Sequence, residues 1–243
     1  MFLFTFDNRN ILYTGDFRIS INSVSKYGHL HKSNGDPINI DALYIDTTFQ
    51  NIASFPTREE TVADFINEIV KWLRASNQHC LALHTSANYG YEFVFNEIYR
   101  RLNMKVCVGD VKWNLYSKFP AIANAVTPKY ENTRIHVCRN RTEKKEHTQC
   151  LSHCENSIFL YAHFSAMKWR EYEEDETFLK IYGNRIDVCF ATHCSRSELV
   201  YFKNYLAPKR TVGFPDAFQS GSPVKNICDS MVCSPKKKKI RVD

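Results

Sequence analysis

Hydrophobic and polar residues alternate in short blocks at the start of the chain. Two apolar segments, Phe2–Phe6 and Ile11–Tyr13, flank the turn-forming residues 7–10, which predicts a β-hairpin. A third strand is expected at Ala42–Ile45. Each of the last two strands runs directly into an acidic residue, Asp16 after the hairpin and Asp46 after the third strand. Carboxylates in such positions are typical of ligands presented from a sheet edge.

The next part of the chain alternates between helix and strand patterns. Thr57 and Glu60 form a capping-box pattern that predicts the start of a helix. Apolar residues then follow the helical spacing, at Val62, Phe65, Ile66, Ile69, Val70 and Leu73. A strand at Cys80–His84, a helix at Tyr91–Leu102 and a strand at Lys105–Val108 complete a β-α-β-α-β order. This order predicts a small α/β layer domain with parallel strands.

Strand patterns return after a polar stretch that is rich in Cys and His. Strands are expected at Ile158–Ala162 and Val188–Ala191. Ser195 and Glu198 form a second capping box, which predicts a helix that ends at Leu206. Beyond Pro223 the periodicity fades.

Composition places the chain among ordinary folded proteins, with 243 residues, 44% hydrophobic and 24% charged. No apolar run approaches the roughly 18 residues of a membrane span. The nine cysteines are an odd number, which favours a reducing compartment over a disulfide framework. The net charge is +6, but the segment 224–243 alone carries six basic and two acidic residues. The rest of the chain is therefore close to neutral.

A second set of residues has the spacing of metal ligands. In the strand-like segments Lys105–Val108 and Arg134–Cys138, period 2 places Cys107, and His136 with Cys138, on the faces opposite the apolar residues. A His-x-Cys pair on one strand face lets an imidazole and a thiolate converge on one tetrahedral ion. Further donors follow closely at His147, Cys150, His153 and Cys154. Buried free thiols are the alternative interpretation.

Four quoted segments together resemble a known family. Leu12–Arg18 (Leu-Tyr-Thr-Gly-Asp-Phe-Arg) resembles the fourth motif of metallo-β-lactamase-fold nucleases. Tyr44–Phe49, followed by Phe55–Glu60, resembles motif A of the β-CASP subfamily, and Phe190–Glu198 resembles its motif B. The resemblance covers about residues 9–220, with the motifs in the family's order. The chain is thereby identified as a β-CASP protein of the DNA-repair type.

The resemblance implies a fold and a domain organisation. The expected fold is α/β, a partial metallo-β-lactamase αββα fold with an inserted β-CASP α/β cassette. Residues 1–50 and 158–225 are expected to form the metallo-β-lactamase part, and residues 51–157 the cassette with a structural zinc site. Residues 226–243 form a basic tail.

It also implies an activity. The family cleaves phosphodiester bonds with divalent metal ions, zinc and/or magnesium, which polarise the phosphate and generate hydroxide near neutral pH. Asp16 takes the place of the metal-bridging aspartate, His193 supplies an imidazole to a metal, and Asp46 lies in the same cleft. The expected protein is a DNA nuclease, with endonuclease and 5′-to-3′ exonuclease action on ends, hairpins and overhangs. Its expected process is double-strand break repair by non-homologous end joining, with interstrand cross-link repair as a further role.

The implied partners and second metal site follow from the same resemblance. DNA and the DNA-dependent protein kinase are the expected partners, for a protein that is expected to be a monomer and to have no membrane association. DNA-repair members carry a cassette zinc site of the type His…His-x-Cys…Cys. The matching residues here are Cys107, His136, Cys138 and Cys154, with Cys107 replacing the first histidine.

The chain also departs from the family. The first three motifs, including His-x-His-x-Asp-His, should precede Asp16, where only about fifteen residues stand. The pair His29 and His31 comes after Asp16 and is interpreted as a loop coincidence. We therefore expect a chain truncated at its N-terminus that is inactive by itself. The alternative is a catalytically incomplete β-CASP module that binds DNA or a repair partner.

The choice of nucleic acid depends on the third β-CASP motif. RNA-processing relatives carry a histidine there, whereas DNA-acting relatives carry a small aliphatic residue. Ala217 occupies this position, after a loop expected at Lys209–Gly213, which favours DNA over the weaker alternative of an RNA-processing nuclease.

The basic tail predicts a cellular location. Its charge is concentrated in five residues, Lys236, Lys237, Lys238, Lys239 and Arg241. Such a run resembles a nuclear-import signal, so the nucleus is the expected location. A solvated tail without contacts is the alternative.

Overall fold

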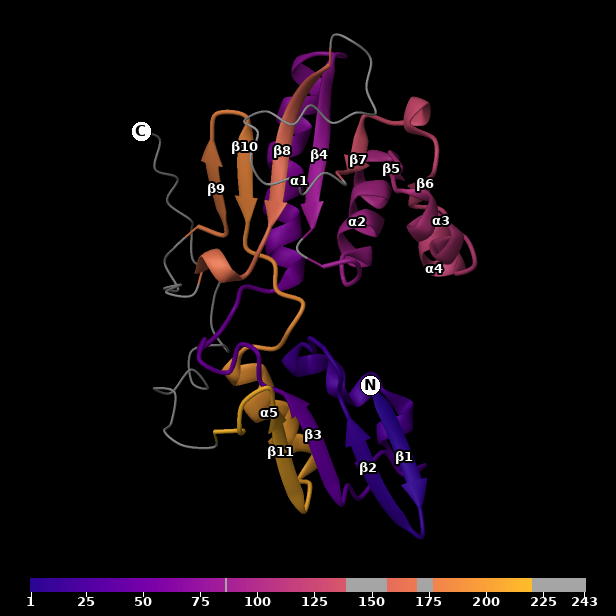
Figure 1. The fold of residues 1–243 in the computed structure, drawn as a ribbon, viewed down its shortest axis with the longest axis vertical. Coiled ribbons are helices and arrows are strands. Elements are labelled where there is room, and N and C mark those ends of the chain that lie inside the picture. The colour runs from indigo at the N-terminus through magenta and orange to yellow at the C-terminus, as the bar shows by residue number, and fades with distance from the viewer. Residues whose placement is uncertain (86, 139–156, 170–176, 220–243) are drawn as a thin grey trace.

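A computed structural model describes residues 1–85, 87–138, 157–169 and 177–219 of the 243. These residues form two units, one above the other in Figure 1, each built on its own sheet. The larger sheet has seven strands and the smaller has four, and both mix parallel and antiparallel pairs. The α/β class expected from the sequence is therefore confirmed. No helix in the described part of the chain is long and apolar enough to cross a membrane.

The smaller sheet has the strand order β1-β2-β3-β11. Its strands are β1 (Phe2–Phe6), β2 (Arg9–Tyr13), β3 (Ala42–Asp46) and β11 (Arg210–Phe214). β1 and β2 form the predicted antiparallel hairpin, whereas β3 is parallel to both β2 and β11. The helix α5 (Arg196–Leu206) and the short helices η1 (Ile21–Lys26) and η2 (Gly28–Leu30) supply the remaining elements of this unit. Leu199 and Phe202 of α5 are fully buried in its core.

The hairpin turn is tighter than predicted. Asp7 and Asn8 both have positive φ, at 45° and 59°, so a two-residue turn joins the strands. Asp and Asn tolerate this conformation better than most residues. β2 consequently begins at Arg9, two residues before the predicted start.

The larger sheet has the order β6-β5-β7-β4-β8-β10-β9, in which β9 alone is antiparallel to its neighbour. Its strands are β4 (His79–Thr85), β5 (Val106–Cys107), β6 (Val126–Thr127), β7 (Ile135–Val137), β8 (Ile158–Phe164), β9 (Leu179–Tyr182) and β10 (Arg185–Val188). The helices are α1 (Arg58–Ala75), α2 (Glu92–Leu102), α3 (Asp110–Tyr116), α4 (Pro120–Ala123), η3 (Tyr130–Asn132) and η4 (Met167–Trp169).

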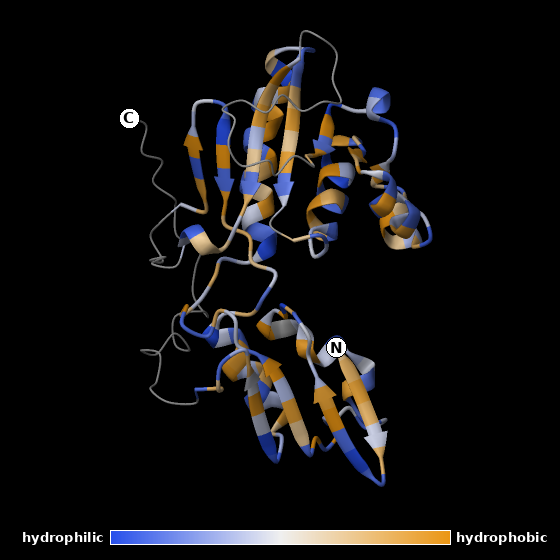
Figure 2. Cartoon of the chain, viewed as in Figure 1, coloured by the Kyte–Doolittle hydropathy of each residue, from blue (hydrophilic) through white to orange (hydrophobic). Residues whose placement is uncertain are grey.

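One face of the larger sheet holds the main core. α1 and α2 bury their apolar faces there, with Phe65 and Phe95 among the fully buried side chains. The capping box predicted at the start of α1 is present, because Thr57 accepts a hydrogen bond from the amide of Glu60 while the Glu60 carboxylate accepts one from the amide of Thr57. Figure 2 shows the resulting alternation of apolar and polar residues along these elements.

The larger sheet extends beyond residue 158, where the sequence predicted that the α/β unit ends. β8 pairs with β4, and β10 pairs with β8, so both strands extend the larger sheet. The chain returns to the smaller unit only after Val188, where β10 ends. The α/β unit predicted between residues 51 and 157 therefore continues to residue 188.

Two further predictions about this region are wrong. The apolar run Val188–Ala191 is not a strand beyond Val188, because the chain leaves the sheet there. Its residues are buried by packing instead, since Phe190 stacks on Tyr91 and Ala191 contacts a small cluster around Phe49. The predicted loop Lys209–Gly213 mostly forms β11, which pairs along its full length with β3.

Candidate metal centre

Asp46 lies at the carboxyl end of β3, at the centre of the smaller sheet, and is 1% exposed. One carboxylate oxygen accepts hydrogen bonds from the amide of Thr48 at 2.9 Å and from its hydroxyl at 2.6 Å. The amide of Asp46 donates to the Thr14 hydroxyl at 3.1 Å. These bonds fix the carboxylate at the edge where the parallel strands end.

Asp16 reaches the same edge from the neighbouring strand β2. The chain leaves β2 through Thr14, whose amide bonds to the Tyr44 carbonyl of β3, and then through Gly15 with φ +58°. This left-handed conformation is easily adopted by glycine and turns Asp16 toward Asp46. Asp16 itself is exposed to solvent.

His193 comes to this edge from the segment that joins β10 to α5. Its Nδ1 donates to the second carboxylate oxygen of Asp46 at 2.6 Å, and its ring packs edge-on against Phe49. Single ligand atoms of Asp16, Asp46 and His193 all lie within 4.8 Å of one another. Within the described ranges, this is the group of three His, Cys, Asp or Glu residues close enough to hold one ion.

Electrostatics keep this cluster ionised. Burial opposes ionisation of Asp46, but the hydrogen bonds from His193 and Thr48 outweigh it and hold the pKa of Asp46 below its ordinary value. The hydrogen bond to Asp46 raises the pKa of His193 against the effect of burial, and the negative charge of Asp16 adds to this. The two shifts stabilise a carboxylate on Asp46 and favour the protonated form of His193 when no metal is bound.

The donor set fits a divalent cation. Two carboxylates and an imidazole are ligands that zinc accepts, and the carboxylates also suit magnesium. Because Nδ1 of His193 is bonded to Asp46, Nε2 is the ring nitrogen left to face an ion, an arrangement common around metal-bound histidines. The Asp46 carboxylate thus serves both to orient His193 and to charge the site.

Arg18 and Glu198 hold segments next to the metal centre in place, a role that the sequence pattern did not predict. The guanidinium of Arg18 bonds to Glu198 at 3.0 Å in an almost fully buried ion pair and donates to the carbonyl of Pro56 at 2.8 Å. The other Glu198 oxygen accepts the amide of Ser195 at 2.8 Å, which completes the predicted capping box of α5. This charged pair thereby joins the segment that follows Asp16 to the segment that follows His193.

The pair His29 and His31 does not join the centre. The ring nitrogens of His31 bond to the Tyr27 carbonyl at 2.9 Å and to the Tyr205 hydroxyl at 2.8 Å. His31 therefore holds a loop onto α5, in agreement with its interpretation as a coincidence of sequence.

The second predicted metal site is only partly described. Cys107 and His136 are register partners on the neighbouring strands β5 and β7, so their side chains share a sheet face, and Cys138 follows two residues after His136. His136 and Cys138 are buried, and the Cys107 thiol donates to the Pro128 carbonyl at 3.8 Å. Cys154, its rivals His147, Cys150 and His153, and the basic tail lie outside the described residues.

One segment of the chain matches a known protein family. Residues 120–213 match the family described as DNA repair metallo-beta-lactamase. This segment contains His193, α5 and all of β11 except Phe214, together with strands of the larger sheet.

The chain is also similar to several curated proteins over most of its own length. It is 29% identical to Protein artemis of Homo sapiens over 242 residues and 28% identical to that of Rattus norvegicus over 240 residues. Protein artemis of Danio rerio is 27% identical over 242 residues. Each match covers 94% of this chain, which spans about a third of the length of these relatives. The chain is therefore similar to Artemis proteins, and its segment 120–213 is similar to the DNA repair metallo-beta-lactamase family.

Proposed function

We propose that this chain carries part of the catalytic centre of a metal-dependent DNA nuclease that acts in double-strand break repair by end joining. The observation that supports it most directly is the convergence of Asp16, Asp46 and His193, three residues separated by up to 177 positions, within 4.8 Å. An exposed carboxylate, a buried carboxylate and an oriented imidazole meet at one sheet edge. Such a cluster is typical of a functional site, and the chain is similar to DNA repair enzymes.

Each residue has a distinct task in this proposal. Asp16 and Nε2 of His193 are the groups that would hold the ion. Asp46 keeps His193 in the required tautomer through the 2.6 Å bond to Nδ1, and Thr48 keeps Asp46 in place. A divalent ion bound there would polarise a phosphodiester and lower the pKa of a bound water. The surrounding hydrogen bonds fix the ligands before substrate arrives, which reduces the reorganisation needed for catalysis.

The loop after β11 supports DNA as the substrate. Residues 215–218, which carry Ala217 in place of a histidine, fold back onto the loop that follows Asp46. The Thr47 hydroxyl donates to the Asp216 carbonyl at 2.8 Å, and the Gln50 amide donates to the Ala217 carbonyl at 3.1 Å. The third motif therefore lies against the metal-centre loop, and it carries an alanine where RNA-processing relatives carry a histidine.

The assay for this function uses labelled hairpin and overhang DNA, with a matched RNA, in magnesium, manganese or zinc. Asp16 and His193 are only two ligand groups, fewer than the three that a catalytic ion normally needs, so we expect weak cleavage at most. That cleavage should disappear in Asp16→Asn and persist in Asp7→Asn, a charge-matched change in the exposed hairpin turn. Cleavage that Asp16→Asn leaves intact would place the reaction elsewhere and contradict the proposal.

Two other outcomes are informative. Efficient cleavage that depends on Asp16 would show that residues beyond the cluster complete the centre. DNA binding without cleavage in any metal would favour the alternative function, a catalytically incomplete β-CASP module, and preferential cleavage of the RNA would favour an RNA-processing enzyme.

We also propose a structural zinc ion held by Cys107, His136, Cys138 and Cys154. The shared face of Cys107 and His136 and the burial of His136 and Cys138 support it. Purified protein should contain one zinc per chain at this site, and Cys138→Ala should lose both the zinc and thermal stability. Elemental analysis without zinc, or unchanged melting of the variant, would remove the idea.

The proposed process requires a nuclear protein. The run Lys236–Lys239 is the expected import signal, and the DNA-dependent protein kinase the expected partner. A reporter fused to residues 230–243 should enter the nucleus and should lose this location when the four lysines become alanine. Equal distribution of both reporters would contradict the proposed signal.

A further inference from the structure

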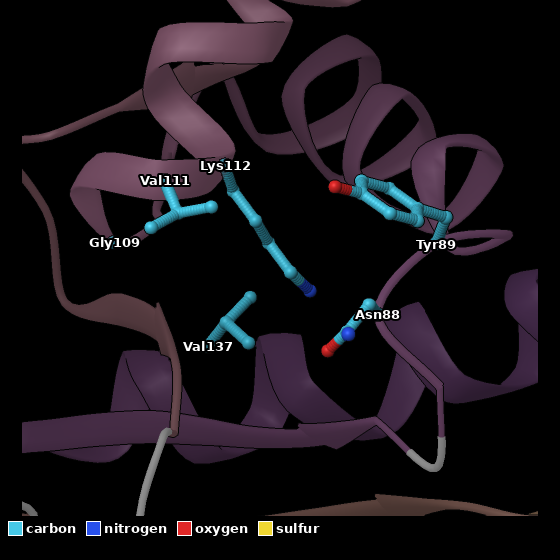
Figure 3. A pocket seen from close by; sticks show the side chains of 6 residues that line it. All are labelled: Asn88, Tyr89, Gly109, Val111, Lys112 and Val137. Atoms are coloured by element: carbon cyan, nitrogen blue, oxygen red, sulfur yellow. The ribbon is translucent and has the colours of Figure 1, made fainter.

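A small cavity of about 210 Å³ lies at the carboxyl end of the larger sheet, on the side of α3. Its lining residues come from three separate segments, as Figure 3 shows: Asn88, Tyr89, Gly109, Val111, Lys112 and Val137. Asn88 and Tyr89 follow β4, Gly109 follows β5, and Val137 ends β7. The carboxyl ends of parallel strands are the usual place for ligands in such sheets.

The lining combines apolar walls with two nitrogen-bearing side chains. Val111 and Tyr89 are 76% and 48% exposed at the rim. The ammonium group of Lys112 and the side-chain amide of Asn88 extend into the same space from opposite sides (Figure 3). Apolar and aromatic walls with a few placed polar groups are typical of small-ligand sites. The volume is below the roughly 300 Å³ at which sites for larger ligands begin, so it suits a single planar ring.

The Tyr89 ring is held in a defined orientation. It packs edge-on against Tyr116 at a centroid distance of 6.4 Å, and the Tyr116 hydroxyl donates to Glu92 at 2.6 Å. The other oxygen of Glu92 accepts the amide of Gly90 at 2.9 Å, directly beside Tyr89. The Glu92 carboxylate thus holds both Tyr116, which packs against the Tyr89 ring, and the backbone next to Tyr89. A ring that is already fixed in place lowers the entropic cost of stacking a ligand on it.

The loop that lines the cavity approaches the segment that carries His193. Gly90 has φ +97°, and a Cβ added there would lie 2.8 Å from Cγ2 of Thr192. The loop that carries Tyr89 therefore packs closely against Thr192, the residue that precedes His193. A strand of nucleic acid that has one phosphate at the metal centre would have a neighbouring nucleotide within reach of this cavity.

We propose that the cavity binds one unstacked nucleotide of single-stranded DNA, with its base on the Tyr89 ring and its phosphate at the Lys112 ammonium. This assignment rests on the proposed nuclease function. It specifies a nucleotide that the enzyme would bind next to the cleaved phosphodiester bond. Aromatic stacking and a single cation are the recurrent elements of single-strand recognition without sequence preference.

The test measures binding of a fluorescein-labelled oligodeoxythymidylate of about twelve nucleotides to the 243-residue chain in a chelating buffer, so that cleavage plays no part. Tyr89→Ala and Lys112→Met should each weaken binding between about fivefold and a hundredfold. Tyr130→Ala and Lys118→Met are matched controls, since Tyr130 is also 48% exposed and Lys118 is an exposed lysine just beyond α3. Both should bind within about twofold of the unchanged chain. Melting curves verify that all four variants are folded.

The outcomes separate this inference from the proposed function. Wild-type binding by both cavity variants, or no binding by the unchanged chain, overturns the inference even if Asp16-dependent cleavage is found. Loss of binding in the cavity variants upholds it even if no cleavage is found. If free thymidine monophosphate competes as well as the oligonucleotide, the cavity binds a free nucleotide and the strand model is wrong.

Discussion

The two sheets contain similar apolar strands but bury them to very different degrees. In the larger sheet, Leu81 and Leu83 of β4 and Ala162 of β8 are fully buried beneath α1 and α2. In the smaller sheet, all five residues of β1 are exposed, including three phenylalanines. A hydrophobic strand pattern therefore predicts a strand, but the elements packed against it decide whether it becomes core.

The metal centre belongs to the region where these two units meet. Asp16 and Asp46 are fixed by strands of the smaller sheet, whereas His193 arrives on the segment that leaves the larger one. An ion that binds Asp16 and His193 would link segments that also meet through the small cluster around Phe49. The site should therefore respond to the stability of both units.

The largest expected contrast comes from the same substitution in each unit. Phe65→Ala removes a fully buried ring that packs against Phe164, and should cost about 3–5 kcal/mol of unfolding free energy. Phe4→Ala removes a ring that is 54% exposed, and should change that free energy by no more than about 0.5 kcal/mol. Urea denaturation followed by circular dichroism measures both. Comparable losses would mean that β1 is covered in solution.

The elements that the sequence predicted well are those with local signals. Thr57 and Ser195 mark their helices through residues only three positions away, and both capping boxes are present. β11 lacks such a signal, because it becomes a strand by pairing with β3, about 170 positions earlier. The strand prediction at Val188–Ala191 was wrong for a related reason. Residues that are buried between the two units give the same apolar run as residues that are buried in a sheet.

The candidate site also has some features that the sequence predicts and others that it does not. The position of Asp16 and Asp46 at strand ends was predictable, because adjacent parallel strands end at one edge. The hydrogen bond from His193 to Asp46 and the Arg18–Glu198 pair were not, since each joins residues about 150 to 180 positions apart. The spacing of residues in sequence contains no information about such contacts.

Metal binding should have the next largest effect. An ion that binds only the folded chain adds about 2.7 kcal/mol at a concentration one hundred times its Kd. Zinc or manganese should therefore raise the melting temperature relative to chelating buffer, and Asp16→Asn should abolish the rise. Because Asp16 is exposed, this variant should match the unchanged chain without metal. Asp7→Asn is the control, and an equal loss of the rise there would indicate non-specific binding.

Acid should weaken the larger unit through His163 on β8. Burial, with the positive charges of Lys168 and Arg185, lowers the pKa of His163 from 6.5 to about 4, and its Nδ1 has no hydrogen-bond partner among the described residues. Between these values the unfolded chain binds more protons than the folded chain, so stability is complete above pH 6.5 and declines as the pH falls toward 4.

The decline should be no more than about 2 kcal/mol after allowance for partial solvation. His163→Asn should flatten the pH dependence of the urea midpoint across this window. The nearby carboxyl of Asp187 titrates separately. Burial opposes its ionisation, but hydrogen bonds from Lys168 and Arg185 outweigh this and lower its pKa, so its contribution is lost only below about pH 3.8. An unchanged slope between pH 4 and 6.5 in the variant would exclude His163 as the cause.

The smallest expected difference separates the two capping boxes. Thr57 is exposed, so water can replace its hydroxyl, and Thr57→Ala should cost about 0.5–1 kcal/mol. Ser195 is fully buried, and its hydroxyl donates at 2.9 Å to Glu198, the carboxylate that also pairs with Arg18. Removing that hydroxyl leaves a buried charge with one bond fewer, so Ser195→Ala should cost closer to 2 kcal/mol. It should also reduce the metal-dependent rise in melting temperature, because α5 begins three residues after His193, whereas Thr57→Ala should leave that rise intact. Equal costs for the two caps, with the metal effect unchanged in both, would show that the Arg18–Glu198 pair does not connect α5 to the metal centre.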